Sequence, residues 1–130
     1  MIASPLRLAI HLVVFLVFLS LWTWKLLEPH PVSDEIRQGL GEYNYVAAKS
    51  LHAAGYAFLT LLAATMPVAR RWRIALVVFM FLHGVGTEIG QTYVPNRTGK
   101  VSDVVIDWFG CSMGLGFVGL VSRTRKRRSG

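Results

Sequence analysis

Charged residues are scarce in this sequence. Only 16% of its 130 residues are Asp, Glu, Lys or Arg, whereas 53% are hydrophobic; a soluble domain usually has ~25% charged residues. The charges fall mostly between long apolar runs, which leave too few residues for a separate water-soluble domain. The composition therefore excludes an ordinary soluble protein and predicts one membrane domain over residues 1–130.

Cysteine and the common catalytic motifs are also nearly absent. Cys111 is the only cysteine, so no disulfide can form within the chain. It lies inside an apolar run, where a thiol is usually a small packed residue rather than a reactive group. The sequence has no HExxH pair, GxSxG elbow or Cys-rich metal pattern, so known hydrolase signatures are missing. We expect no cofactor, and the need for a metal stays undecided.

Four apolar runs account for most of the chain. Each is close to the ~20 residues that a helix needs to cross ~30 Å of hydrocarbon. We therefore predict an all-α integral membrane bundle of four transmembrane helices, at about residues 6–27, 47–68, 72–94 and 103–122. The first run ends in Trp22, Trp24 and Lys25 without an A-x-A-like cleavage site, so we interpret it as a retained, interface-anchored span.

The basic residues predict how the bundle is oriented, because Lys and Arg resist translocation. Arg70, Arg71 and Arg73 lie between the second and third runs, and the tail at 123–130 carries five more basic residues. We place both in the cytoplasm, so both termini are cytoplasmic and the tail contacts anionic membrane lipid. This layout accounts for the net charge of +7. No nucleic-acid partner is expected, since no aromatic-interleaved platform accompanies the tail.

Polar residues gather at one end of three of the runs: Lys49, His52 and Tyr56; Glu88 and Gln91; Asp103 and Asp107. In the predicted orientation all three ends lie on the outer side. Spacings of three and four residues put the members of each group on one face of a helix. Ionisable side chains at this depth avoid lipid and face a bundle interior or a water-filled cavity. We therefore expect one buried polar cluster below the outer surface.

The connection after the third run adds a cation to this cluster. In the segment 94–99, the proline cannot continue a helix and the glycine permits left-handed dihedrals, which predicts a turn that presents Arg97 at the helix mouth. Lys49 and Arg97 are the cations expected to neutralise the carboxylates. Asp103 has an equally good structural role, because an acidic residue near a helix start caps free N–H groups.

Together these residues resemble those of a known family, the VanZ-like membrane proteins. The resemblance covers about residues 45–115 and rests on Lys49-x-x-His52-x-x-x-Tyr56, Glu88-x-x-Gln91, Pro95-x-Arg97, Asp103 and Gly110. It implies a small multi-pass helical protein of the bacterial cytoplasmic (inner) membrane. The founding member is associated with low-level resistance to teicoplanin, which implies a connection to the cell envelope and antibiotic resistance. Asp107 departs from the family pattern, which often has Asn there, and adds a potential negative charge.

Two classes of function fit the cluster best. In the first, it binds the head group of an amphipathic molecule, such as a lipid-linked envelope precursor or a lipopeptide or glycopeptide antibiotic. The ligand-binding residues would then be Lys49, Tyr56, Gln91, Arg97 and Asp103. In the second, it is a membrane-embedded enzyme acting on a lipid-linked substrate, with Glu88, His52 and Asp107 as catalytic residues. Glu88 or His52 would be the general base, and an aspartate would orient a cation, a metal or the attacking group.

Two further interpretations stay open. A proton channel or small transporter would use Glu88, Asp107 and His83 and would require a homo-oligomer. A structural plug would pair the polar groups with one another and fix the register of the helices. His83 itself is more typical of a hydrogen-bonded core residue than of a ligand. Gly110 and Gly114 form a GxxxG pair, for which internal packing is favoured over dimerisation.

Overall fold

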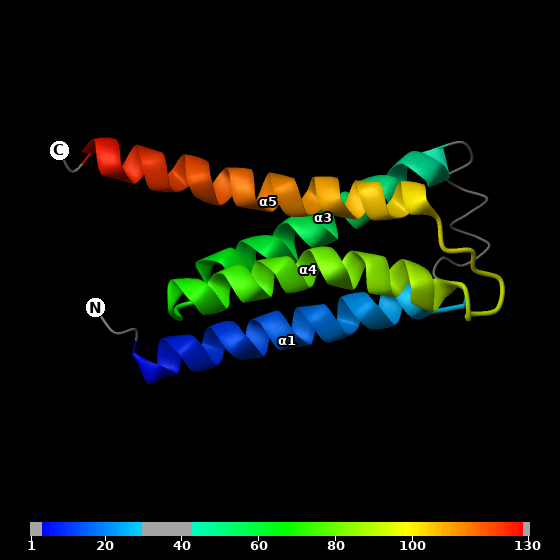
Figure 1. Ribbon diagram of the computed structural model, residues 1–130, viewed down its shortest axis with the longest axis horizontal. Coiled ribbons are helices and arrows are strands. Elements are labelled where there is room, and N and C mark those ends of the chain that lie inside the picture. The colour runs from blue at the N-terminus through cyan, green and yellow to red at the C-terminus, as the bar shows by residue number, and fades with distance from the viewer. Residues whose placement is uncertain (1–3, 30–42, 129–130) are drawn as a thin grey trace.

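The computed structural model describes residues 4–29 and 43–128, without the side chains of Asn44 and Arg125, and this part of the chain is all-helical. The helices are α1 (Pro5–Leu27), α3 (Tyr43–Thr65), α4 (Arg70–Gln91) and α5 (Val101–Arg128) (Figure 1). All four are long and apolar enough to cross a membrane. The predicted all-α fold with four membrane-spanning helices is therefore confirmed.

The ends of α1 lie within one residue of the predicted span, and the ends of the other helices differ from theirs by two to four residues, except that α5 ends six residues later than predicted. α3 ends at Thr65 rather than 68, because a residue that precedes a proline, here Pro67, is disfavoured in helical conformation. α1 begins at Pro5, after Ser4 accepts a hydrogen bond from the Arg7 N–H at 3.3 Å. α5 continues through the basic tail to Arg128, because hydropathy marks the apolar part of a helix and not its end.

α3 is the central element of the bundle. It contacts all three other described helices, and its contact with α5 is the most extensive in the bundle. α1 packs on α3 and α4, and the described residues show no contact between α1 and α5. Figure 1 shows the helices running side by side, with the connection from α4 to α5 and the C-terminal end of α1 at the same end of the bundle.

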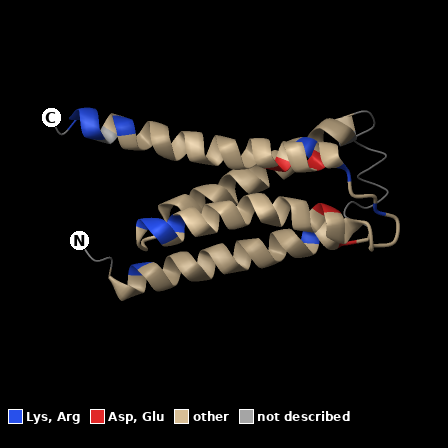
Figure 2. Cartoon of the chain, viewed as in Figure 1, with Lys and Arg blue, Asp and Glu red and all other residues tan. Residues whose placement is uncertain are grey.

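The charged residues separate toward the two ends of the bundle (Figure 2). The start of α4, with Arg70 and Arg71, and the basic end of α5 lie at one end, whereas Glu88, Asp103 and Asp107 lie toward the other. The predicted orientation requires this separation, and the side that faces the cytoplasm remains a prediction. The connection between the first two apolar runs, at 30–42, lies outside the described residues.

Two glycines bring α3 and α5 into backbone contact. A Cβ atom at Gly110 would overlap the carbonyl oxygen of Ala53, and one at Gly114 would overlap that of Ala57. The predicted use of this GxxxG pair for internal packing is confirmed. Gly116, on the same helix, has nothing within 4 Å of its would-be Cβ.

We predict that Gly114→Ala destabilises the bundle by ~1–3 kcal/mol, because the added methyl group meets backbone atoms that cannot move independently. Gly116→Ala is the matched control, since its methyl group enters open space. Thermal unfolding of both variants in detergent micelles measures the difference. Equal melting temperatures for the two variants would contradict the close contact of α3 and α5.

The orientation can be tested by cysteine labelling in a Cys111→Ala background. Ala69 and Thr98 are both exposed, and they lie in the connections at opposite ends of the bundle. We expect a membrane-impermeant maleimide to label Thr98→Cys in intact spheroplasts, and Ala69→Cys only after permeabilisation. The reverse pattern would invert the predicted topology.

Candidate functional site

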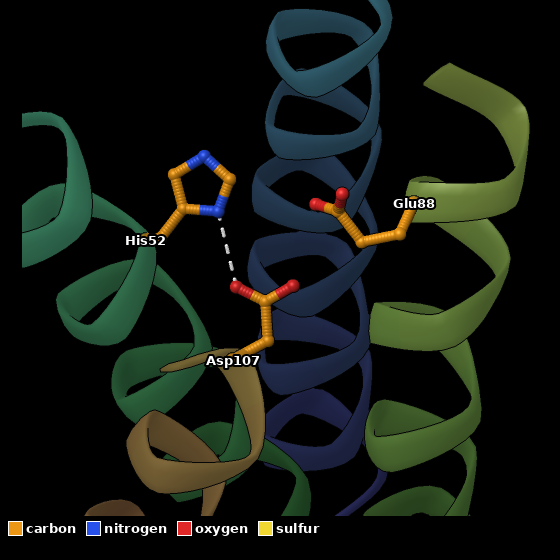
Figure 3. A group of neighbouring side chains, drawn as sticks. All are labelled: His52, Glu88 and Asp107. Carbon is orange, nitrogen blue, oxygen red and sulfur yellow. Dashed lines mark hydrogen bonds and ion pairs between the residues drawn. The ribbon is translucent and has the colours of Figure 1, made fainter. Parts of the chain in front are cut away.

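Three ionisable side chains from three helices meet at one end of the bundle (Figure 3). His52 comes from α3, Glu88 from α4 and Asp107 from α5, and each offers one atom within 4.8 Å of those of the others. His52 Nδ1 lies 3.1 Å from Asp107 Oδ1. The exposed fractions of Glu88 and Asp107 are only 4% and 0%. Figure 3 shows the Glu88 carboxyl group pointing toward the other two side chains. We call these three residues the carboxylate–histidine cluster.

The cluster residues of α4 and α5 lie on the same helix faces as the buried core residues. The buried residues of α4 recur at spacings of three and four along one face: Met80, Gly84, Thr87, Glu88 and Gln91. Asp107 lies on the equivalent face of α5, one turn before the buried Cys111. A Cβ at Gly84 would lie 3.2 Å from that of Asp107, so the absence of a side chain at Gly84 lets the aspartate approach α4.

The helix ends close over the cluster through two further contacts. Lys49 of α3 forms an ion pair with Asp103 of α5, which is the neutralisation predicted for Lys49. The backbone N–H of Lys100 donates to Glu88 Oε2 at 2.9 Å, so one oxygen of this carboxylate is fixed by the connection between α4 and α5. The sequence did not indicate this contact, because a backbone donor leaves no residue signature.

The turn before Lys100 differs from its prediction in one respect. The left-handed residue is Asn96, with φ of 62°, rather than Gly99, because Asn also tolerates this region. Gly99 is needed for another reason, since a Cβ there would overlap the backbone oxygen of Glu88. The connection therefore folds back tightly onto the end of α4.

A separate chain of hydrogen bonds lies deeper in the bundle and joins residues of α1, α3 and α4. The Tyr56 hydroxyl lies 3.0 Å from both His83 Nδ1 and Thr87 Oγ1, and His83 Nε2 lies 2.8 Å from Thr23 Oγ1. Both ring nitrogens of His83 are thus hydrogen-bonded, which confirms it as a core residue. Tyr56, which was predicted to bind ligand, is fully buried, and its hydroxyl group takes part in these hydrogen bonds. Thr23 and Thr87 could not be selected from the sequence, because threonines in apolar helices commonly bond to their own backbone.

Arg97 is directed toward the end of α1 rather than toward a carboxylate. Its Nε donates to the Glu28 carbonyl at 3.0 Å, and its Nη2 donates to the carbonyls of Leu26 at 2.9 Å and Lys25 at 3.3 Å. The last carbonyls of a helix lack internal partners, and a cation there is favoured by the helix dipole. Burial lowers the pKa of Arg97 from its ordinary value, while the nearby charge of Glu88 raises it. The structure therefore shows Arg97 capping α1.

Several buried polar atoms near the cluster have no hydrogen-bond partner among the described residues. They include Glu88 Oε1, Asp107 Oδ2, the Gln91 amide nitrogen and the Trp22 indole nitrogen. Leaving a buried polar group unpaired costs ~1–3 kcal/mol, more when it is charged. The carboxylate–histidine cluster therefore does not satisfy its own members.

An apolar groove between α1 and α3 borders the cluster. It has a volume of about 400 Å³ and is lined by Phe18, Leu21, Trp22, Trp24, Lys25, Gly55, Phe58 and Leu59. Trp22 also meets the rings of His52 and Tyr56 edge-on, with centroids 6.1 and 6.2 Å away. Its ring lies where a Cβ at Gly55 would be. Trp22 thus lies between the groove and the polar residues, and its predicted place at the membrane interface stays a prediction.

We predict that Arg97→Lys lowers the melting temperature, because an ammonium group cannot reach the three carbonyls that the guanidinium contacts. The expected loss is ~1–3 kcal/mol of folding free energy. Arg70→Lys is the control, since Arg70 is exposed at the opposite end. Thermal unfolding in micelles measures both variants; unchanged stability of Arg97→Lys would argue against the capping role.

One comparison with known proteins identifies the family of the chain. The VanZ/LLP1 family model matches residues 6–122, which include every residue of the cluster and nearly all of the first three helices. No curated protein and no solved structure is detectably similar to the chain. The family match covers most of the sequence, and the chain therefore belongs to the VanZ/LLP1 family of membrane proteins.

Proposed function

We propose that this protein binds the head group of an amphipathic cell-envelope molecule at the carboxylate–histidine cluster, on the outer side of the bacterial cytoplasmic membrane. The ligand would be a lipid-linked envelope precursor or a lipopeptide or glycopeptide antibiotic. The observation that carries the proposal is the pair of unpartnered oxygens, Glu88 Oε1 and Asp107 Oδ2, buried beside an apolar groove.

The free polar atoms favour a particular head-group chemistry. Glu88 Oε1 and Asp107 Oδ2 accept hydrogen bonds, whereas the Gln91 amide and the Trp22 indole donate them. Hydroxyl and amino groups of a sugar or peptide would satisfy the two carboxylates, and its carbonyl or hydroxyl oxygens would accept from the donors. The cations are less suited to bind an anion directly, because Lys49 is paired with Asp103. Arg97 is engaged by backbone carbonyls.

The groove would hold the hydrocarbon chain of the same molecule. Its walls are almost entirely apolar, and Trp22 is shared between the groove and the cluster. A chain that leaves the bilayer for this groove gains little hydrophobic free energy, since lipid tails are as apolar as the groove walls. The groove therefore positions the ligand, and the polar contacts supply most of the discrimination.

A purely structural plug fits these observations less well. Such a plug pairs its polar groups, as Lys49 with Asp103 and Tyr56 with His83 do. The carboxylate–histidine cluster leaves two carboxylate oxygens unpaired at a cost to stability, and unsatisfied groups of this kind are typical of binding sites.

A membrane-embedded enzyme is the second candidate. The contact of 3.1 Å between His52 Nδ1 and Asp107 Oδ1 is the arrangement by which a carboxylate orients an imidazole general base. A lipid-linked substrate held in the groove would present its head group to this pair. An enzyme of this kind would form product from a lipid-linked substrate. The His52→Asn variant should lose this activity, whereas Leu21→Trp should keep it at saturating substrate.

The binding proposal predicts that purified wild-type protein retains a lipid class enriched over the bulk membrane, or is stabilised against heat by added teicoplanin. We expect Glu88→Gln to weaken retention or stabilisation by ~10- to 100-fold, because a hydrogen bond to a charged group contributes ~1.5–3 kcal/mol. Leu21→Trp should do so by filling the groove, of which Leu21 is a lining residue. Lipid mass spectrometry and thermal shift are the measurements.

The matched control is Leu82→Trp, because Leu82 is an exposed leucine on α4 that does not line the groove. It should retain the wild-type lipid profile. Folded wild-type protein without lipid enrichment and without a response to teicoplanin would refute the proposal, as would equal ligand retention in Glu88→Gln.

A further inference from the structure

We propose that His52, Glu88 and Asp107 bind a divalent transition-metal ion of the Zn²⁺ or Mn²⁺ class. The inference does not depend on which amphipathic ligand is bound. It assigns to the ion the same two unpaired carboxylate oxygens, so in the metal-loaded protein the head group would contact the ion instead of these oxygens. It rests on the positions of three ligand atoms, on the two unpaired carboxylate oxygens, and on the distribution of charge around them.

The geometry is close to that of a coordination sphere. The three candidate ligand atoms lie within 4.8 Å of one another, so they need to draw together by less than ~1 Å to reach the ~2.0–2.2 Å bonds of a metal centre. One pair, His52 Nδ1 and Asp107 Oδ1, is already 3.1 Å apart. Neighbouring ligands of one ion, at ~2.1 Å and near a right angle, lie ~3 Å apart. An ion bound between these two atoms would replace their hydrogen bond.

The unpaired oxygens point to a cation independently of these distances. Glu88 and Asp107 have exposed fractions of 4% and 0%, and neither Glu88 Oε1 nor Asp107 Oδ2 has a partner among the described residues. Figure 3 shows the Glu88 carboxyl group directed into the space between His52 and Asp107. Buried charges in proteins are normally paired or bound to metals. No cation among the described residues is hydrogen-bonded to either of these two oxygens, and His52 contacts only the other oxygen of Asp107.

The two cations that were predicted to neutralise the cluster, Lys49 and Arg97, are engaged elsewhere. Lys49 pairs with Asp103 at the mouth of the cluster. Arg97 donates to the carbonyls at the end of α1. A divalent ion would balance the formal charges of Glu88 and Asp107, with a neutral His52 as the third ligand.

The outer contacts hold these ligands in place, as expected for a metal site. Glu88 Oε2 accepts from the Lys100 backbone N–H at 2.9 Å, which leaves Oε1 for the ion. Asp107 is held against Gly84, whose would-be Cβ lies 3.2 Å from the aspartate Cβ. One nitrogen and two oxygen ligands suit Zn²⁺ or Mn²⁺ better than the all-oxygen sites of Ca²⁺. Three protein ligands would also leave coordination positions for water or a head-group oxygen.

The test uses the full chain in detergent micelles, stripped with a chelator and then dialysed against Zn²⁺ alone or Mn²⁺ alone. We expect the wild type to bind about one ion per chain and to gain thermal stability on binding. Asp107→Asn and Glu88→Gln should each bind at least ~100-fold more weakly. With Mn²⁺, electron spin echo spectroscopy should detect a histidine nitrogen that is lost in His52→Asn.

Glu28→Gln is the matched control, because Glu28 is a carboxylate at the same end that pairs with Lys25 at 2.6 Å. It should bind metal like the wild type. Thermal unfolding without metal identifies any variant that fails to fold, and the wild-type stoichiometry does not depend on the variants. The proposal would be overturned if folded wild-type protein bound less than ~0.1 ion per chain, or if the Asp107→Asn variant bound as much metal as the wild type. Either result would indicate that the buried carboxyl groups are protonated instead of bound to an ion.

Lipid retention is measured on the same metal-free and metal-loaded samples. If the protein retains lipid in the metal-free sample and binds no ion in the metal-loaded sample, the proposed ligand binding stands and only the proposed metal site is refuted. If the protein binds one ion per chain and retains no lipid, the metal site stands and the proposed ligand binding is refuted.

Discussion

The cost of holding carboxylates inside an apolar bundle governs this structure. Glu88 and Asp107 lie on helices whose other surfaces suit hydrocarbon, and each would cost several kcal/mol if it faced lipid. They must therefore point inward and toward groups that can stabilise them. The orientation of α4 and α5 about their own axes follows from this requirement, and the meeting of His52 with Asp107 fixes the rotation of α3 in the same way.

Backbone contact between α3 and α5 makes this meeting sterically feasible. Gly110 and Gly114 let the two helices approach until backbone meets backbone. Short side chains such as Asp107 reach a partner on another helix only at such a distance. Small residues therefore determine the spacing, and the polar residues determine which faces are turned inward.

Much of this arrangement could be predicted from the sequence. Apolar length gave the four helices, and the spacing of Glu88, Gln91, Asp103 and Asp107 gave a common depth and face. However, the depth of a residue in the membrane and the helix face on which it lies do not show which side chains of other helices it contacts. Arg97 was expected beside the carboxylates and instead caps α1, because backbone carbonyls at a helix end compete for a guanidinium without leaving a mark in the sequence. The packing of Trp22 against Gly55 on α3 was likewise not predicted, because a single glycine in a helix does not show which side chain covers it.

The groove has one more consequence, which concerns how a ligand arrives. Phe18, Leu21, Trp24 and Phe58 are exposed on the outside of the bundle, so in a membrane this side of the protein faces acyl chains directly. A molecule dissolved in that leaflet diffuses in two dimensions and is far more concentrated there than in the aqueous phase. Modest intrinsic affinity then suffices for high occupancy, and the composition of the bilayer, more than the dissolved concentration, sets how often the groove is filled.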